Sequence, residues 1–573
     1  MGFFKNLEPK NRRDFLLALL VSAIVLIKRL LIASYGINRE APIEMESILL
    51  AMEGNLIYRD FIWYHGFFPI YWHALIFKLF SPEMVYLRLF VTVFATVAAF
   101  FAYWVARFFL SPGKAFAAAL LGFTGLIVPE HVTGTMMAFC FFILSFYWIL
   151  DYCKTGNVRS LFFAGLAGGV TSLAQVLPLG FLALVGGGGA IICFGVFERR
   201  ETGKNLKHFL WGYLPLPVLG YGGLALIIPT RDLWTNLLPM FSGFEANPKV
   251  YATLPFPDLF PALTPAATFS GWIAPLNTYL VSSFRWWLIV LIFFLGLIAF
   301  GVAWRYKKKT GTELILLGTL VLYGPLFEGE FLLYTGRLGL TPNYINMLPT
   351  FILLFYLLNS TSTGERLTSP LAATLLLVYL VYPFGKYYAY FSQQALPLGM
   401  PHSKGISVSP YKHDLYHKTV KFIRANTAAG DKIVFAGVNR YFSIFSGRKD
   451  VFRSNFLTFI KTSFYPRREA DGWINIASEY EKDIVDKIAS SRAKLLLMPE
   501  TFFKNSNAEA SPFLFYLEKN WTLRERFGNE NMVSPYEYEP PLLAFTLNTG
   551  SELGNRELAI PEGMSDKNIQ TGT

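Results

Sequence analysis

Apolar blocks long enough to cross a lipid bilayer recur along this chain, and they constrain its fold more than any other feature. The hydrocarbon core of a bilayer takes about 20 residues of apolar helix. Because an unsatisfied backbone amide or carbonyl is costly in hydrocarbon, each crossing segment must be helical. The blocks predict about 11 transmembrane helices, at residues 15–35, 86–110, 114–129, 133–152, 160–175, 177–197, 208–229, 286–304, 313–330, 343–359 and 370–391. We therefore predict a polytopic α-helical membrane protein.

The composition agrees with this class and excludes others. Of the 573 residues, 53% are hydrophobic and 16% are charged, which is not the composition of an ordinary soluble protein. A net charge of +12 suits nucleic-acid binding, but lysine and arginine gather in short loops between apolar blocks, where they report topology. We predict no nucleic-acid partner. Cys140, Cys153 and Cys193 lie in or beside apolar blocks, so we predict neither a disulfide framework nor a zinc site.

The basic loops predict the orientation of the chain. Cytoplasmic loops of membrane proteins are enriched in lysine and arginine. Counted alternately from a cytoplasmic N-terminus, the inner loops hold Lys114, Lys154, Arg159, Arg199, Arg200, Lys204, Lys207, Arg305, Lys307, Lys308, Lys309 and Arg366. We predict a multi-pass protein of the cytoplasmic (inner) membrane, with everything after residue 391 on the periplasmic or extracellular side.

Two long loops of the predicted transmembrane domain (residues 1–391) fall on the outer side, at 36–85 and 230–285. Within the first, the block at 67–80 is short and contains Pro69, His73 and Lys78, so we predict an interfacial helix. A tilted span is the alternative, but it would invert every later loop against the basic pattern. The second loop is rich in aromatic residues and proline, which suits either a lid or an interfacial belt.

After residue 391 the composition changes to that of a soluble domain. Residues 415–426 and 480–490 have helical periodicity, and residues 432–436, 494–498 and 542–547 are typical of strands. Alternating helices and strands predict an extracytoplasmic α/β domain at 392–549. The tail at 550–573 is polar and aperiodic, which is typical of disorder.

Several short motifs carry a resemblance to a known family. The first outer loop contains Tyr58-Arg59-Asp60-Phe61, then His65-Gly66, and later Phe77-Lys78-Leu79-Phe80. Further motifs are Gly336-Arg337, Asn343-Tyr344, Leu348-Pro349, Phe422-Ile423-Arg424, Lys432-Ile433-Val434-Phe435 and Ser446-Gly447-Arg448. In order and spacing they resemble the GT-C superfamily of glycosyltransferases, particularly bacterial relatives of the dolichyl-phosphate-mannose protein mannosyltransferases and of the lipid A aminoarabinose transferases.

The resemblance implies an inverting glycosyltransferase. Its donor would be a sugar on a polyprenyl phosphate, and its acceptor a lipid, glycan or protein outside the membrane. The family carries an Asp-Glu pair in this loop, which, counted back from Tyr58, falls on Glu40-Ala41. The histidine of its late motif is replaced by Asn343 or Tyr344. The resemblance therefore favours Glu40 as the catalytic carboxylate and leaves Glu44 and Glu46 open.

Such a transfer needs a base, because the acceptor hydroxyl loses a proton as it attacks the anomeric carbon. Three glutamates, Glu40, Glu44 and Glu46, crowd into seven residues of the first outer loop, and carboxylates crowded near lipid hold protons more readily than solvated ones. Glu44, Glu46 and Glu53 could instead form the wet face of a short loop helix. Asp60 is a further catalytic candidate whose alternative role is structural.

The leaving lipid phosphate needs positive charge at the outer surface. Arg337, Arg59, Arg39 and Lys249 are the available cations, and Tyr58 and His65 are further substrate-binding candidates. Arg337 is the first choice for the phosphate, with a snorkelling anchor as its alternative. A divalent cation would serve the same purpose, but the sequence requires no cofactor and shows no metal-ligand motif. Membrane lipids complete the predicted partners.

Two other classes of protein stay open. A transporter would place polar residues near the midplane of spans in both halves, whereas most charged residues here lie in loops. A non-catalytic scaffold or sensor would use the outer domain for binding. The departure from the Asp-Glu pair keeps this alternative open, and Glu328 and Glu330 are reserve candidates for the base.

Overall fold

The computed structural model describes the chain in several stretches. These are residues 9–35, 41–61, 66–124, 133–175, 179–198, 201–229, 395–435, 441–452, 467–469, 472–474, 478–499, 512–528 and 541–548, with the single residues 63, 233, 348, 351, 352, 355 and 356. The predicted spans at 286–304, 313–330 and 370–391 lie outside them, as do most of 343–359, nearly all of the loop 230–285, and the tail at 550–573.

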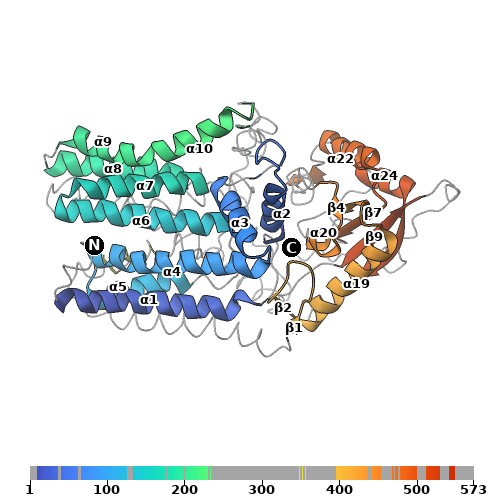
Figure 1. Cartoon of the computed structure of the whole chain (residues 1–573), viewed down its shortest axis with the longest axis horizontal. Coiled ribbons are helices and arrows are strands. Elements are labelled where there is room, and N and C mark those ends of the chain that lie inside the picture. The colour runs from blue at the N-terminus through green and yellow to red at the C-terminus, as the bar shows by residue number, and fades with distance from the viewer. Residues whose placement is uncertain are drawn as a thin grey trace, which may run out of the picture. The chain divides into compact units, whose positions relative to one another are not determined.

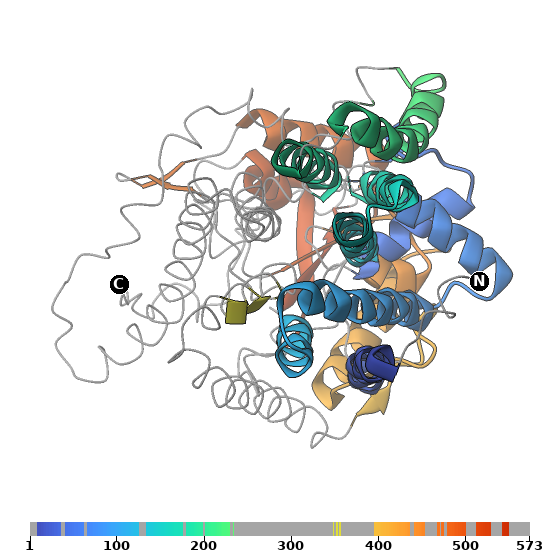
Figure 2. The same cartoon turned by 90° about the vertical axis from the view of Figure 1, so that its left-hand side faces the viewer.

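The described N-terminal stretches form a helical bundle (Figure 1). Its helices are α1 (Pro9–Ala33), α3 (Phe68–Leu79), α4 (Met84–Phe109), α5 (Pro112–Thr124), α6 (Thr133–Thr155), α7 (Val158–Ala174), α8 (Phe181–Glu198), α9 (Thr202–Tyr213) and α10 (Pro215–Ala225). A further helix, α2 (Ala41–Met52), follows α1 in the chain and belongs mostly to a second compact unit. In Figure 1 the long helices α1, α4, α6 and α7 run side by side, and Figure 2 shows several helices of the bundle nearly end-on. The helices of the bundle enclose one apolar core.

Two of the described helices, Met84–Phe109 and Gly134–Thr155, are long and apolar enough to cross a membrane, judged by length and composition. Val158–Ala174 and Ala183–Ile192 are apolar but shorter. Helices therefore occupy the positions of the predicted spans within the described residues. The full number of crossings and the orientation of the termini stay predictions.

The span predicted at 208–229 is divided between α9 and α10. Pro215 has no amide hydrogen to donate to the carbonyl of Trp211, which interrupts the helical hydrogen bonding. Leu214, between the two helices, keeps helical backbone angles of φ −65° and ψ −38°. The division is thus a proline kink in one helical segment.

Polar contacts fix α1 against α4 at both ends. Near the start of α1, Asp14 Oδ1 accepts hydrogen bonds from the Tyr103 hydroxyl at 2.6 Å and from Arg107 Nε at 3.0 Å. At the end of α1, Arg88 Nη1 donates to the carbonyl oxygens of Ala33 at 2.9 Å and Tyr35 at 3.0 Å. Because the start of one helix meets the end of the other, α1 and α4 are antiparallel. This arrangement agrees with the alternation used to predict topology.

Glycines let α7 and α9 pack backbone to backbone. Gly165 and Gly169 of α7 are four residues apart, the spacing found where membrane helices approach closely. A Cβ atom at Gly165 would lie 2.0 Å from the carbonyl oxygen of Phe209. One at Gly212 of α9 would lie 2.1 Å from the carbonyl oxygen of Phe162. The contact leaves no room for a side chain at either position.

We expect Gly165→Ala to lower the free energy of unfolding by roughly 2 kcal/mol, because the added methyl group forces two helix backbones apart. Thermal unfolding of the purified protein in detergent measures the effect. Gly189→Ala on α8 is the matched control, since a Cβ atom there meets nothing within 4 Å. Equal unfolding transitions for the two variants would contradict the close α7–α9 contact.

The short helix α3 occupies the block predicted as an interfacial helix. Its 12 residues span about 18 Å, less than the ~30 Å of a hydrocarbon core. It lies against α6 and α7 and crosses the bundle at a steep angle in Figure 1. His73 on α3 is fully buried, with Nδ1 2.6 Å from the carbonyl oxygen of Pro69. Burial lowers the pKa of His73 to about 4, so its ring is neutral at physiological pH.

The chain divides into two units. Unit 1 comprises Met1–Tyr35, Ala51–Arg59 and Trp63–Gln393, and unit 2 comprises Gly36–Leu50, Asp60–Ile62 and Gln394–Thr573. The sequence predicts that the whole loop 36–85 belongs to the transmembrane domain, whereas most of α2 groups with the C-terminal residues.

The described C-terminal residues form an α/β structure. Its helices are α19 (Pro410–Asn426), α20 (Tyr441–Ser446), α22 (Ser478–Ser491) and α24 (Pro512–Asn520). Its strands are β1 (Leu396–Pro397), β2 (Ser407–Val408), β3 (Lys432–Phe435), β4 (Lys449–Asp450), β5 (Arg467–Glu469), β6 (Gly472–Ile474), β7 (Leu495–Pro499), β8 (Trp521–Phe527) and β9 (Leu542–Leu547). The main sheet has the order β4-β3-β7-β9-β8. β4, β3 and β7 are parallel, and β9 and β8 add two antiparallel pairings.

Helices cover both faces of this sheet. On one face, Val434, Leu496 and Phe545 pack with apolar side chains of α22 and α24 in a closed core. On the other, Phe435 of β3 contacts Phe442 of α20, with ring centroids 5.6 Å apart. The alternation of buried side chains along β3 and β7 thus makes a three-layer arrangement.

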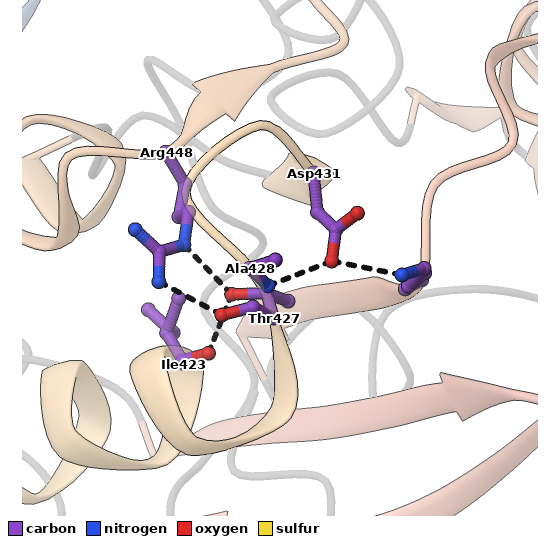
Figure 3. A network of polar contacts seen from close by, with 6 residues as sticks. Ile423, Thr427, Ala428, Asp431 and Arg448 are labelled. Atoms are coloured by element: carbon purple, nitrogen blue, oxygen red, sulfur yellow. Dashed lines mark hydrogen bonds and ion pairs between the residues drawn. The ribbon is translucent and has the colours of Figure 1, made fainter.

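A polar network orders the turn between α19 and β3 (Figure 3). Arg448 Nε donates to Thr427 Oγ1 at 2.9 Å, and Arg448 Nη2 donates to the Thr427 carbonyl oxygen at 2.8 Å. Asp431 Oδ2 accepts hydrogen bonds from the Ala428 amide at 2.7 Å and from Lys494 Nζ at 3.0 Å. The Ala428 amide, and next Lys494, lower the pKa of Asp431. The network joins residues beside the starts of β3, β4 and β7.

Candidate functional site

Two carboxylates of the predicted catalytic loop are buried on one short helix. Glu44 is 3% exposed and Glu46 is 4% exposed, both on α2. Neither is isolated, since each has an interaction partner in the structure. The alternative that both form the wet face of a loop helix is therefore wrong, although Glu53, just after α2, is exposed. Buried carboxylates are costly unless their interactions compensate, so such positions indicate functional or tightly structured sites.

Helix geometry separates the two carboxylates. Successive residues of an α-helix are about 100° apart around its axis, so Glu44 and Glu46 lie about 200° apart on α2. Only one of them can therefore face a given substrate. Glu44 lies in the first turn of α2, where the positive end of the helix dipole stabilises an ionised carboxylate.

A strained turn follows α2. Gly54, with φ +91°, ends the helical course, and its amide donates to the carbonyl oxygen of Ala51 at 3.1 Å. Tyr58 has φ +67°, a left-handed conformation that is uncommon for a bulky residue. Its side chain is fully buried, and burial, followed by the proximity of Tyr221 and Tyr71, raises the pKa of Tyr58 well above its ordinary value. The hydroxyl therefore stays protonated.

The residues after Tyr58 are joined to the end of α7. The Gly66 amide donates to the carbonyl oxygen of Ala174 at 3.0 Å. A Cβ atom at Gly66 would lie 1.9 Å from the carbonyl oxygen of Leu173, so only glycine fits. Phe67 packs edge to face on Tyr221 of α10, with ring centroids 5.3 Å apart. These contacts attach the loop to the end of α7 and to α10.

Hydrogen bonds extend this joint into the bundle. Tyr71 of α3 accepts a hydrogen bond from the Ile57 amide at 3.2 Å. The Tyr221 hydroxyl donates to the carbonyl oxygen of Ser172 at 3.0 Å. The Tyr213 hydroxyl contacts the Ser172 hydroxyl and donates to the carbonyl oxygen of Gly180 at 2.9 Å. The first contact joins the loop to α3, and the others join α7 to α9 and α10.

The structure describes only some of the predicted site residues. Tyr58 is buried, Arg59 is exposed and Asp60 is half-buried. Glu40, His65, Arg337, Lys249 and Arg39 lie outside the described residues, as do Glu328 and Glu330. Tyr58 and Arg59 belong to unit 1, whereas Glu44, Glu46 and Asp60 belong to unit 2.

A metal centre is not visible in the described part of the chain. Within the described ranges, no three His, Cys, Asp or Glu side chains lie together where they would hold an ion. The candidate carboxylates are thus described with their protein contacts alone.

Sequence reasoning missed residues that hold the loop in place. The sequence marks Gly66 only as part of a motif, and no pattern marks Tyr221 or Ser172. Gln175, next to Ala174, is also buried, and its Oε1 accepts no hydrogen bond from the described residues. No local pattern marks these positions, because each depends on contact between segments distant in sequence.

The described part of the chain combines a helical bundle, in which two helices are long and apolar enough to cross a membrane, with an α/β unit. No protein-family model and no curated protein matches the sequence. Among solved structures, the chain is similar to the Archaeoglobus fulgidus oligosaccharyltransferase in the apo form, with 13% identity, 93% of this chain and 76% of that chain covered, and a TM-score of 0.49.

ArnT from Cupriavidus metallidurans is also similar. Its apo structure has 11% identity, 85% of this chain and 93% of that chain covered, and a TM-score of 0.44. Its structure bound to undecaprenyl phosphate covers 94% of this chain and 99% of that chain, with 11% identity and a TM-score of 0.38. Oligosaccharyltransferase and ArnT are GT-C glycosyltransferases, the superfamily that the sequence motifs resemble. At these TM-scores the similarity assigns no activity and no residue role to this chain.

Proposed function

We propose that this protein is an inverting, membrane-embedded glycosyltransferase that takes a sugar from a polyprenyl-phosphate donor. The acceptor is a lipid, glycan or protein on the outer side of the cytoplasmic membrane. The observation that carries the proposal is the burial of Glu44 and Glu46 on the helix of a loop whose motifs resemble the GT-C superfamily. The basic loops support the outer location.

Glu44 is the proposed general base. The acceptor oxygen forms a bond to the anomeric carbon from the side opposite the phosphate. The bond between that carbon and the phosphate oxygen breaks, and the phosphate leaves with the electron pair. The acceptor proton passes to the Glu44 carboxylate. Glu44 is chosen over Glu46 because it lies in the first turn of α2, one helical turn along the sequence from Glu40, the position favoured by the resemblance.

The other candidates take binding or supporting roles. Arg337 and Arg59 are proposed to offset the charge of the leaving phosphate, with Lys249 and His65 at the headgroup level. Asp60 is kept as a second carboxylate of the loop. Tyr58 is reassigned from substrate contact to positioning, because its side chain is fully buried and its left-handed backbone sets the direction of Arg59 and Asp60.

We expect Arg337→Ala to weaken donor binding by at least about 10- to 100-fold, which is the loss expected from a single hydrogen bond to a charged group. Arg337→Lys should restore only part of the affinity, because the planar guanidinium binds phosphate through two parallel hydrogen bonds. Titration of the purified protein with a polyprenyl-phosphate sugar measures both. Arg159→Ala, at an exposed position in the first turn of α7, is the control. Unchanged affinity in Arg337→Ala would return Arg337 to a snorkelling anchor.

A further inference from the structure

A groove with a volume of about 550 Å³ runs along one face of the kinked segment α9–α10. Its described lining begins at Gly203 and ends at Val218, and Leu206, Leu210 and Leu214 lie between them at helical spacing. The lining therefore follows a single stripe of the helix, and almost all of it is apolar. The groove belongs entirely to unit 1.

Part of this face is left uncovered by the described helices, although Leu206 and Leu210 also pack against the core of the bundle. The opposite face of α9 is buried against α7, where Gly212 meets the Phe162 backbone. By contrast, Trp211 is 64% exposed and Val218 is 62% exposed, and both line the groove. Exposed apolar side chains in a continuous stripe indicate a surface that faces lipid or a partner.

One cation marks an end of the groove. Lys207 lines it one turn after Gly203, and the structure records no ion pair for Lys207 with another described residue. Its neighbour Lys204 does not line the groove, and Lys204 Nζ lies 3.4 Å from Glu201 Oε2. Among the described lining residues, Lys207 is therefore the charge available to a ligand in the groove. The basic-loop pattern predicts that this end faces the cytoplasm.

The length of the groove fits one leaflet. From Lys207 to Val218 the helix rises about 16 Å, and half of a hydrocarbon core is about 15 Å. An occupant with a negative headgroup at Lys207 and a chain along the leucines would match both the charge and the length.

We propose that this groove holds an acyl chain of one anionic phospholipid from the cytoplasmic leaflet, with the lipid phosphate against Lys207. The site is distinct from the outer loop where the sugar donor is proposed to react. It requires insertion of the chain in a membrane but not glycosyl transfer. One lysine near a membrane surface contributes about 1 kcal/mol toward an anionic lipid, which corresponds to about fivefold in affinity.

The test uses the full-length protein in nanodiscs that contain a photoreactive phosphatidylglycerol with the reactive group in its acyl chain. After illumination, mass spectrometry locates the labelled peptides. We expect saturable labelling of residues 203–218, displaced by unlabelled phosphatidylglycerol and much weaker with the matching phosphatidylcholine. Lys207→Gln should weaken the apparent affinity about fivefold, whereas Lys204→Gln should leave it unchanged.

A second variant tests the groove without changing its charge. Leu210→Trp fills the space between Leu206 and Leu214, so labelling of this segment should fall although Lys207 is present. The proposal would be overturned if the two lipids labelled the segment equally. It would also be overturned if Lys207→Gln and the wild type were labelled equally, because either result would indicate ordinary lipid contact. In proteoliposomes, labelling by a probe confined to the outer leaflet would overturn it as well. Transfer activity of the same samples reports on the sugar-transfer proposal separately.

Discussion

Glu44→Gln is expected to lower the rate of sugar transfer by ~10²- to 10⁴-fold, the usual contribution of general-base assistance. Glutamine keeps the size and hydrogen-bonding capacity of the side chain but cannot accept the acceptor proton. The buried position of Glu44 in the first turn of α2 motivates the prediction. Initial rates with a polyprenyl-phosphate sugar and saturating acceptor measure it, after monodispersity has shown that the variant is folded.

Matched variants of the same loop decide between the carboxylates. Glu53→Gln is the control, because Glu53 is exposed and should retain full activity. Glu46→Gln should change stability more than turnover, since Glu46 lies about 200° from Glu44 around α2. Loss of activity in Glu40→Gln with full activity in Glu44→Gln would assign the base to Glu40, the position given by the family resemblance. If Glu40, Glu44, Glu46 and Asp60 all tolerate amidation, the base is not in this loop.

Gly66→Ala is expected to abolish most activity and to lower the free energy of unfolding by about 3 kcal/mol. The new methyl group would lie 1.9 Å from the carbonyl oxygen of Leu173, so the loop must leave the end of α7. Loss of this joint also breaks the hydrogen bond from the Gly66 amide to the Ala174 carbonyl. A misplacement of about 1 Å at a reaction centre already costs on the order of 100-fold in rate.

Gly113→Ala, at the start of α5, is the matched control for Gly66→Ala, because a Cβ atom there meets nothing within 4 Å. Thermal unfolding and initial rates should be measured on the same samples. Normal stability and normal rate in Gly66→Ala would show that the loop does not need this joint, and that the reactive groups are positioned in another way.

The apolar blocks predicted the helices of the bundle well, because the length and composition of a block are enough to predict a helix there. The block at 86–110 corresponds to α4 at Met84–Phe109, and the block at 133–152 to α6 at Thr133–Thr155. Pro215 stands inside an apolar run, so the kink could be read from the sequence, but the apolar pattern by itself predicts 208–229 as one continuous span. The pairing of α7 with α9 was not predictable. Glycine spacing indicates a helix face that allows close packing, but it does not indicate which helix packs against that face.

In the C-terminal unit, apolar strands were easier to predict than polar ones. The strand expected at 542–547 is β9 with the same bounds, and the helix expected at 480–490 is α22, at Ser478–Ser491. β8 was missed because Arg524-Glu525-Arg526 gives it a polar centre. It lies at the edge of the sheet, and its register shifts between Leu523 and Glu525. Edge strands carry more polar residues, and a bulge breaks the alternation on which prediction depends.

The residue types in the first outer loop could be predicted to carry chemistry, but the environment of these residues could not be predicted. Three crowded glutamates and Tyr58-Arg59-Asp60 singled out the first outer loop. Burial of Glu44 and Glu46, and the left-handed backbone of Tyr58, depend on what packs around the loop. The periodicity of the sequence shows only that α2 carries acidic residues among apolar ones. This pattern fits a solvent-exposed face as well as a buried one.

Turnover by the purified protein in proteoliposomes is the most direct measurement of what this chain does. The donor is a polyprenyl-phosphate sugar labelled in the sugar, and both the free polyprenyl phosphate and the labelled acceptor are quantified over time. Sugar transfer predicts equal amounts of the two products, with the rate lost in Glu44→Gln and retained in Glu53→Gln. Donor that crosses the bilayer unchanged, or donor that binds without releasing polyprenyl phosphate, would contradict it and indicate a transporter or a non-catalytic binding protein instead.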